Sequence, residues 1–228
     1  MKPYIAEVLG TCIFTLVLIL ATAANPWVAT IFAVFTLMFL AYGLGHVSGA
    51  YVNPALVIGA MFVNKISPLK ALYFIIAEVA GAALAVLVIK YAGIATPAGM
   101  ESAFSWQLFS AELLGTALFA YGVATVAFGR THRAATGFVV GISLFAGIII
   151  SSLFLNGTTV SASLNPAISF GLKALNLASI LGPILGAIIG MWVYVYLSED
   201  VKQVWHGVKR SFKPLSAAAN PSNPSANN

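Results

Sequence analysis

Six stretches of about 20 apolar residues dominate this 228-residue sequence and leave little of it for anything else. A helix of about 20 apolar residues crosses a hydrocarbon core of about 30 Å, so each stretch predicts one membrane crossing. Only 7% of the residues are charged, whereas a soluble domain has about 25%. The chain is therefore expected to be an all-α membrane protein without a soluble domain. The predicted spans are Tyr4–Ala24, Trp27–His46, Leu69–Ile89, Gln107–Phe128, Ala135–Leu155 and Ala178–Leu197.

The positive charges are distributed unevenly between the two sides that six crossings define. With Lys2 placed inside, only Lys90 and Lys173 lie outside. Loops rich in Lys and Arg stay on the cytoplasmic side, so both termini of this cell-membrane protein are expected in the cytoplasm. The net charge of +5 then reflects topology and does not indicate a nucleic-acid partner. The predicted cytoplasmic cations are Lys2, Lys65, Lys70, Arg130, Arg133, Lys202, Lys209, Arg210 and Lys213.

An internal repeat divides the chain into two units. Ala6–Thr11 (AEVLGT) opens the first span, and Ala111–Thr116 (AELLGT) opens the fourth, 105 residues later. Each unit holds three spans, so the second must enter the membrane from the opposite face, and such inverted repeats place their site near the midplane. One membrane domain is expected over 1–213, followed by a disordered tail rich in Ala, Asn, Pro and Ser. Within it we expect repeat one at about 1–91, repeat two at about 105–198, a cytoplasmic segment at 198–213 and then the tail at 214–228.

Each repeat also carries Asn-Pro-Ala between its second and third spans, beginning at Asn53 and at Asn165. Asn is a strong helix N-cap, and Pro is favoured at the first helical position. The stretches His46–Gly59 and Thr159–Gly171 therefore predict a loop that turns abruptly into a short helix inside the membrane. Such re-entrant backbone is tolerated only where it is buried in protein or lines a watery cavity. One copy alone would be weak evidence, but two copies in equivalent places indicate a functional site.

With these paired motifs the sequence resembles the aquaporin family, the major intrinsic proteins, to about residue 200. The resemblance implies an aquaporin-like channel domain: a right-handed bundle of six transmembrane helices and two re-entrant half-helices, with one pore per protomer and a homotetrameric assembly. The half-helices would meet N-terminus to N-terminus, so their positive dipole ends would face the pore centre and repel cations. The implied pore residues are Asn53, Pro54, Ala55, Asn165, Pro166, Ala167 and, at the inner mouth, a neutral His46.

Three carboxyl groups lie within apolar spans, where an ionisable side chain is rare and functional by default. They belong to Glu7, Glu78 and Glu112. A proton relay through them would make the chain an ion-coupled transporter. The resemblance favours structural support for Glu7 and Glu112, because in aquaporins the glutamates of the first and fourth spans accept hydrogen bonds from the re-entrant loops. At the position of Glu78 the family often has Gln.

The sequence departs from the family directly after the second motif. Family members that conduct water or glycerol usually have Asn-Pro-Ala-Arg, whereas this chain has Ile168 in place of the arginine. The family pattern places Ala33, Leu153 and Ala162 at the other three positions of the outer constriction. All four side chains are apolar. Without the arginine we expect a weaker barrier to protons, and either passage of solutes larger than water or hindrance of water by dewetting.

Passive conduction of water is the function that these features favour. The alternative is a broader facilitator of small neutral solutes such as glycerol, urea, ammonia or hydrogen peroxide. An ion-coupled secondary transporter, suggested by the carboxyl groups, and a non-conducting structural membrane protein, suggested by the missing arginine, are further hypotheses. The sequence has no Ser-His-Asp set, phosphate loop or metal cluster, so no enzymatic activity, metal or cofactor is expected. The single Cys12 excludes an internal disulfide.

Overall fold

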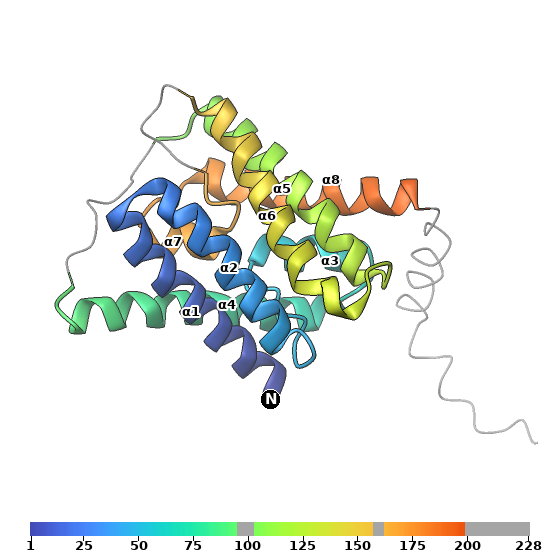
Figure 1. Ribbon diagram of the computed structural model, residues 1–228, viewed down its shortest axis with the longest axis horizontal. Coiled ribbons are helices and arrows are strands. Elements are labelled where there is room, and N and C mark those ends of the chain that lie inside the picture. Colours follow the sequence, from blue (N-terminus) through green and yellow to red (C-terminus); the bar gives the residue numbers. More distant parts are fainter. Residues whose placement is uncertain (95–102, 157–161, 199–228) are drawn as a thin grey trace, which may run out of the picture.

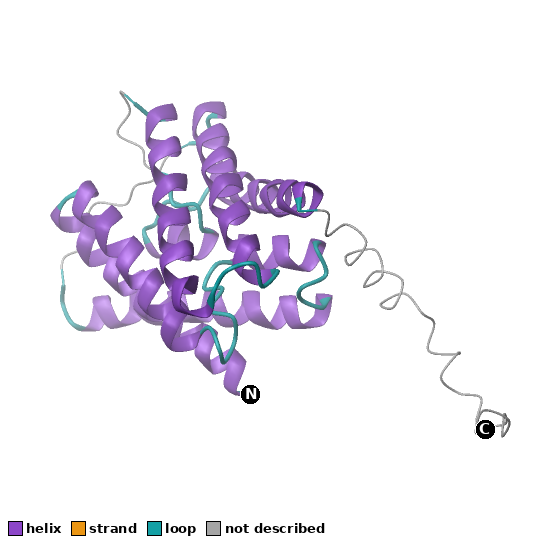
Figure 2. Cartoon of the chain, turned by 45° about the vertical axis from the view of Figure 1, so that its right-hand side comes forward, coloured by secondary structure: helices purple, strands orange, loops and turns teal. Residues whose placement is uncertain are grey.

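The computed structural model describes residues 1–94, 103–156 and 162–198, which are helices joined by loops, without a strand (Figure 2). Six helices in this part of the chain are long and apolar enough to cross a membrane. They are α1 (Lys2–Ala24), α2 (Pro26–Leu44), α4 (Pro68–Tyr91), α5 (Trp106–Ala127), α6 (Thr136–Phe154) and α8 (Leu177–Leu197). Each coincides with a predicted span, and the ends differ by at most two residues. The predicted tail at 214–228, and the cytoplasmic segment beyond residue 198, lie outside the described residues.

Two short helices lie among the long ones, α3 (Pro54–Phe62) and α7 (Pro166–Gly171) (Figure 1). Each follows the second long helix of its repeat, α3 after α2 and α7 after α6. Helix α3 packs against α4, α5 and α8, helix α7 packs against α1, α4 and α8, and the two short helices also contact each other. The predicted bundle of six crossing helices and two half-helices is therefore confirmed over the described residues.

The two repeats build the same helix pair, α1 against α4 and α5 against α8. A Cβ added to Gly81 of α4 would overlap the carbonyl oxygen of Val8, and one added to Gly186 of α8 would overlap that of Leu113. Gly81 and Gly186 are 105 residues apart, and so are Val8 and Leu113. The repeat read from the sequence is thus a repeat of helix packing, in which small residues allow two backbones to approach closely.

Gly186→Ala is expected to destabilise the bundle, because the new methyl group has no space between α8 and the backbone of α5. Inserting one methylene into a well-packed contact costs about 1–3 kcal/mol. The matched control is Gly43→Ala, since a Cβ at Gly43 meets nothing within 4 Å. Thermal unfolding in detergent should show a lower midpoint for Gly186→Ala only. Equal midpoints for the two variants would contradict the close α5–α8 contact.

The outer surface of the bundle is apolar, and its largely apolar interior also contains a set of buried polar side chains. Fully buried polar side chains include Glu7, Glu78 and Thr116, each with 0% of its surface exposed. Burying such groups is unfavourable unless they are hydrogen bonded, while exposed apolar side chains are stable in lipid. This distribution fits a protein surrounded by hydrocarbon. On α2 the large exposed side chains are Trp27, Val28, Ile31, Phe32, Phe35, Phe39 and Tyr42.

Candidate pore

Both short helices begin at the Asn of an Asn-Pro-Ala motif, with nearly identical geometry. The backbone of Asn53 has φ −156° and ψ 109°, and that of Asn165 has φ −156° and ψ 110°. The side-chain oxygen of Asn53 accepts a hydrogen bond from the amide of Ala55, and that of Asn165 accepts one from Ala167, both at 3.0 Å. Each Asn therefore caps its own helix, as N-cap residues do when they accept from the second helical amide.

The two Asn side chains also connect the repeats to each other. The Nδ2 of Asn53 donates to the carbonyl of Leu164 at 2.9 Å, and the Nδ2 of Asn165 donates to the carbonyl of Val52 at 2.8 Å. The exchange is reciprocal, because each acceptor is the residue just before the other Asn. It holds the N-termini of the two half-helices together, where their dipoles place partial positive charge.

The residue before each Asn has a left-handed backbone, which is unfavourable for a β-branched or bulky side chain. Val52 has φ 44° and Leu164 has φ 55°. Such a conformation costs roughly 1–3 kcal/mol and persists only when surrounding contacts impose it. It turns each carbonyl toward the partner loop, so the strain falls at the two residues that accept the reciprocal hydrogen bonds.

Buried carboxyl groups hold these strained loops. Glu7 accepts hydrogen bonds from the amides of Tyr51 and Val52 at 3.2 and 2.8 Å. Glu112 accepts from the amides of Ser163 and Leu164 at 2.9 and 2.8 Å. Glu7 is 0% exposed and Glu112 is 1% exposed. Because nothing in the hydrocarbon can replace these acceptors, the two glutamates are placed to fix the loop conformation.

The third amide in each loop is held differently in the two repeats. The amide of Asn53 donates to Glu78 Oε1 at 2.9 Å, whereas the amide of Asn165 donates to the hydroxyl of Ser163 at 3.4 Å. The Ser163 hydroxyl also contacts Glu112 and the hydroxyl of Ser169. The acceptor for the third amide is thus the carboxyl group of Glu78 in the first repeat and the hydroxyl of Ser163 in the second.

A cavity of about 480 Å³ leads to the paired Asn residues. The N-termini of both half-helices lie at its wall, together with residues from α1, α2, α5 and α6. Every described residue that lines it is uncharged. Its polar side chains are mixed with a larger number of aliphatic and aromatic ones. The lining includes Phe14, Leu18, Thr30, Ala33, Leu37, Val52, Asn53, Phe119, Ile148, Ser152, Asn156, Ala162, Leu164, Asn165 and Ile168.

Three of the four residues predicted for the outer constriction line this cavity, namely Ala33, Ala162 and Ile168. Leu153 does not, and its placement there is corrected. Its side chain is 71% exposed on the outside of α6, while Ile148 and Ser152 of the same helix face the cavity. One residue along a helix turns the side-chain direction by about 100°, so a count that is off by one residue moves a side chain from the cavity to the lipid.

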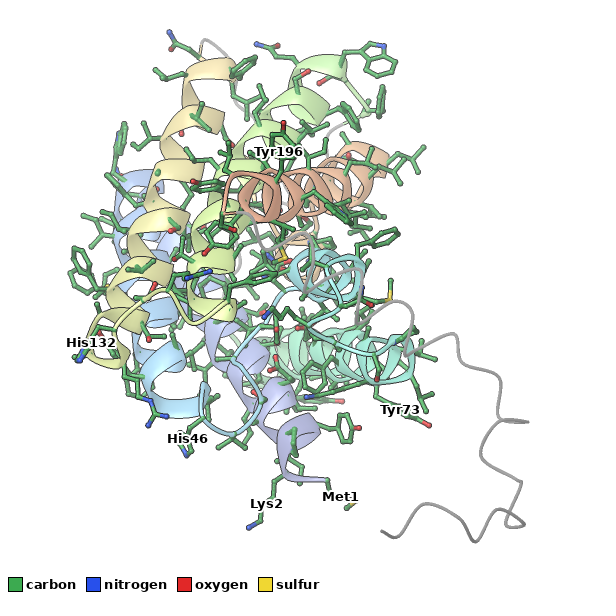
Figure 3. All side chains as sticks on the ribbon, turned by 90° about the vertical axis from the view of Figure 1, so that its right-hand side faces the viewer. Met1, Lys2, His46, Tyr73, His132 and Tyr196 are labelled. Atoms are coloured by element: carbon green, nitrogen blue, oxygen red, sulfur yellow. The ribbon has the colours of Figure 1, made fainter. Side chains whose placement is uncertain are left out.

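The other predicted pore residues occupy different environments. His46 is exposed in the turn after α2, is absent from the cavity lining, and lies at the same end of the molecule as Met1 and Lys2 (Figure 3). Ala55 and Ala167 are 0% and 1% exposed. These alanines, with Pro54 and Pro166, form the first turns of α3 and α7. None of the four residues lines the cavity.

Several residues that shape the site were not singled out from the sequence. Val52 and Leu164 accept the reciprocal hydrogen bonds, and Ser163 joins the second loop to Glu112. The repeat offered a signal for the first two, because each directly precedes an Asn-Pro-Ala motif. Backbone carbonyls accept hydrogen bonds whatever the side chain, so the residue types alone do not predict these two acceptors.

Six crossing helices around two half-helices that meet end to end, with an uncharged cavity leading to the meeting point, have the architecture of a channel-forming integral membrane protein. No group of three or more His, Cys, Asp or Glu side chains that would hold a metal ion occurs in the described ranges.

The chain belongs to the major intrinsic protein family, whose family model matches residues 1–194. It is 31% identical over 199 residues to aquaporin AqpM of Methanothermobacter thermautotrophicus, covering 77% of this chain and 79% of that relative. It is also 31% identical over 163 residues to aquaporin TIP1-1 of Arabidopsis thaliana, covering 66% and 61%. The crystal structure of the aquaglyceroporin from Plasmodium falciparum shares the fold, with a TM-score of 0.62 and 20% identity over 90% of this chain and 98% of that one. Members of this family are channels, so this multi-pass membrane protein is a passive channel and not an enzyme.

Proposed function

We propose that this protein conducts water through the cavity and past the paired Asn53 and Asn165. The observation that carries the proposal is their reciprocal hydrogen bonding, at 2.9 and 2.8 Å, beside a cavity of about 480 Å³. Each Nδ2 has two hydrogens and gives one to the partner loop, so the other remains for a passing water. The helix dipoles that converge here oppose a cation without hindering a neutral molecule.

A broader facilitator of small neutral solutes is the second candidate, and the composition of the cavity favours it. Ile168, which is 1% exposed, occupies the place where the family usually has arginine, and Ala33 and Ala162 line the same cavity. Ser169 does not contact the solute, because its hydroxyl is buried and hydrogen bonded to Ser163 and to the carbonyl of Asn165. Small apolar side chains leave width for glycerol, urea, ammonia or hydrogen peroxide.

An ion-coupled mechanism has less support. The side chains of Glu7, Glu78 and Glu112 accept hydrogen bonds from loop amides and are absent from the cavity lining. A relay would need carboxyl groups in contact with the conduction path. We further propose a homotetramer in the cell membrane, for which the family resemblance is the support. The distribution of Lys and Arg is the support for placing both termini in the cytoplasm.

Ile168→Arg tests which solutes the cavity admits. The guanidinium group would narrow the cavity and add hydrogen-bond donors and a positive charge. If native protein conducts glycerol or urea, we expect Ile168→Arg to reduce that flux by about tenfold or more, which corresponds to a barrier raised by about 1.4 kcal/mol. Water flux should fall much less, because water is the smaller molecule.

Stopped-flow light scattering of proteoliposomes measures the fluxes of water, glycerol and urea. The matched control is Leu153→Arg, which places the same side chain on the same end of the bundle but on the exposed face of α6. Unchanged solute flux in Ile168→Arg would contradict the role of Ile168 as the selective residue. Fast water flux with solutes excluded by native protein would reject the broader facilitator and leave the water channel.

A further inference from the structure

The first Asn-Pro-Ala loop contains a pair of carboxyl groups that has no counterpart in the second. Three consecutive amides donate to this pair: Tyr51 and Val52 to Glu7, and Asn53 to Glu78. Glu7 and Glu78 thus accept hydrogen bonds from the adjacent amides of Val52 and Asn53, and both side chains are 0% exposed. In the second repeat Pro183 lies 105 residues after Glu78, so Glu112 has no acidic neighbour at that position.

Ionising both of two carboxyl groups that adjacent amides hold in a buried site is unfavourable, because like charges repel strongly where water is excluded. Tyr51, whose amide donates to Glu7, is the other titratable residue beside this pair. A proton between the two carboxyl oxygens removes the repulsion and forms an O–H···O bond, which is the arrangement known for carboxyl pairs that share a site.

The hydrogen bonds to the two carboxyl groups favour Glu78 as the residue that carries the proton. Both oxygens of Glu7 accept from backbone amides, which is the pattern of an ionised carboxylate. Glu78 accepts through Oε1 only, and its Oε2 is buried without a donor. A hydrogen on Oε2 would therefore occupy the oxygen of Glu78 that accepts from no amide.

We propose that Glu78 is a protonated carboxylic acid that donates to Glu7, and that this acid–carboxylate pair positions Asn53 in the pore. The pair presents three acceptors to three successive amides and carries one negative charge. It thus fixes the strained backbone of Val52, and with it the carbonyl that Asn165 binds. The positioning of Asn53 for conduction rests on the proposed conduction of water, whereas the protonation state of Glu78 does not.

Infrared spectroscopy tests the protonation state without any measurement of transport. Native protein in an ester-free detergent should show the carbonyl stretch of a buried carboxylic acid, which Glu78→Gln removes. Glu112→Gln is the comparison in the other repeat and should leave the band in place. Absence of the band in native protein, or its persistence in Glu78→Gln, would overturn the proposal.

Conservative and non-conservative variants test the positioning role. Gln at position 78 offers an oxygen to the amide of Asn53 and an N–H to Glu7, so it reproduces the protonated acid. Leu offers neither and leaves the amide unsatisfied. We expect Glu78→Leu to lower water flux about tenfold relative to native protein. Glu78→Gln should keep most of the native water flux. Glu7→Gln should behave like Glu78→Leu, because its NH2 group would face one of the two amides that Glu7 accepts from. Equal effects of the Gln substitutions at positions 7 and 78 would contradict the assignment of the proton.

Discussion

Replacing Asn53 and Asn165 together with leucine is expected to reduce the water permeability of proteoliposomes to that of empty liposomes. The double variant removes both helix caps and both reciprocal hydrogen bonds, and it places two branched apolar side chains where the cavity ends. The carbonyls of Val52 and Leu164 would also lose their partners. Leucine offers no group to a passing water, so both the width and the hydrogen bonding of the path are lost.

Loss of a helix cap alone does not explain the expected effect. Asn176 also caps a helix, accepting from the amides of Ala178 and Ser179 at 2.8 and 3.1 Å, but it does not line the cavity. Asn176→Leu is therefore the matched control, expected to lower stability by about 1 kcal/mol and to leave conduction largely intact. Near-native water flux in the Asn53→Leu, Asn165→Leu variant would show that the conduction path does not pass between these residues.

Glu112→Leu is expected to have the second large effect, on the folded structure as well as on flux. Two donors would lose their acceptor, the amides of Ser163 and Leu164, which lie 2.9 and 2.8 Å from the carboxyl oxygens. The hydroxyl of Ser163 would keep the carbonyl of Asn165, 3.2 Å away. Each unsatisfied buried group costs about 1–3 kcal/mol, so the loop before α7 should lose its conformation. The midpoint of thermal unfolding in detergent should fall steeply.

The matched control for this substitution is Leu114→Ala, a change on the exposed face of the same helix. It changes an apolar side chain of α5 without touching the loop, so any general effect of substitution in this helix appears in both variants. The unfolding midpoint of Glu112→Gln should lie between those of native protein and Glu112→Leu, because the amide oxygen of Gln can still accept from one of the loop amides. If Glu112→Leu and the native protein have the same midpoint of thermal unfolding, the hydrogen bonds between Glu112 and the second loop do not stabilise the protein. The proposed support role of Glu112 is then wrong.

Much of this fold follows from the sequence alone. The six spans depend only on the length of apolar stretches, and the half-helices begin where Asn and Pro predict a helix start. The duplicated Glu7 and Glu112 pointed to equivalent places in two repeats. These features are local, or recur at a fixed spacing, so reading along the chain is sufficient.

The details of the site required the structure. The position of Leu153 was counted back from the second motif, across the loop between α6 and α7, and no periodicity fixes the register of a loop. The reciprocal hydrogen bonds join residues more than 100 positions apart and use backbone carbonyls. Glu7 and Glu78 reach adjacent amides of the first loop because α1 packs against α4, which their separation in sequence does not reveal.

Osmotic shrinkage of proteoliposomes, followed by stopped-flow light scattering at several temperatures, tests the channel most directly. We expect native protein to accelerate shrinkage well beyond empty liposomes, with a weaker temperature dependence than diffusion through lipid, because water would move along hydrogen-bonding groups through an open path. Rates and temperature dependence equal to those of empty liposomes would contradict conduction of water between Asn53 and Asn165.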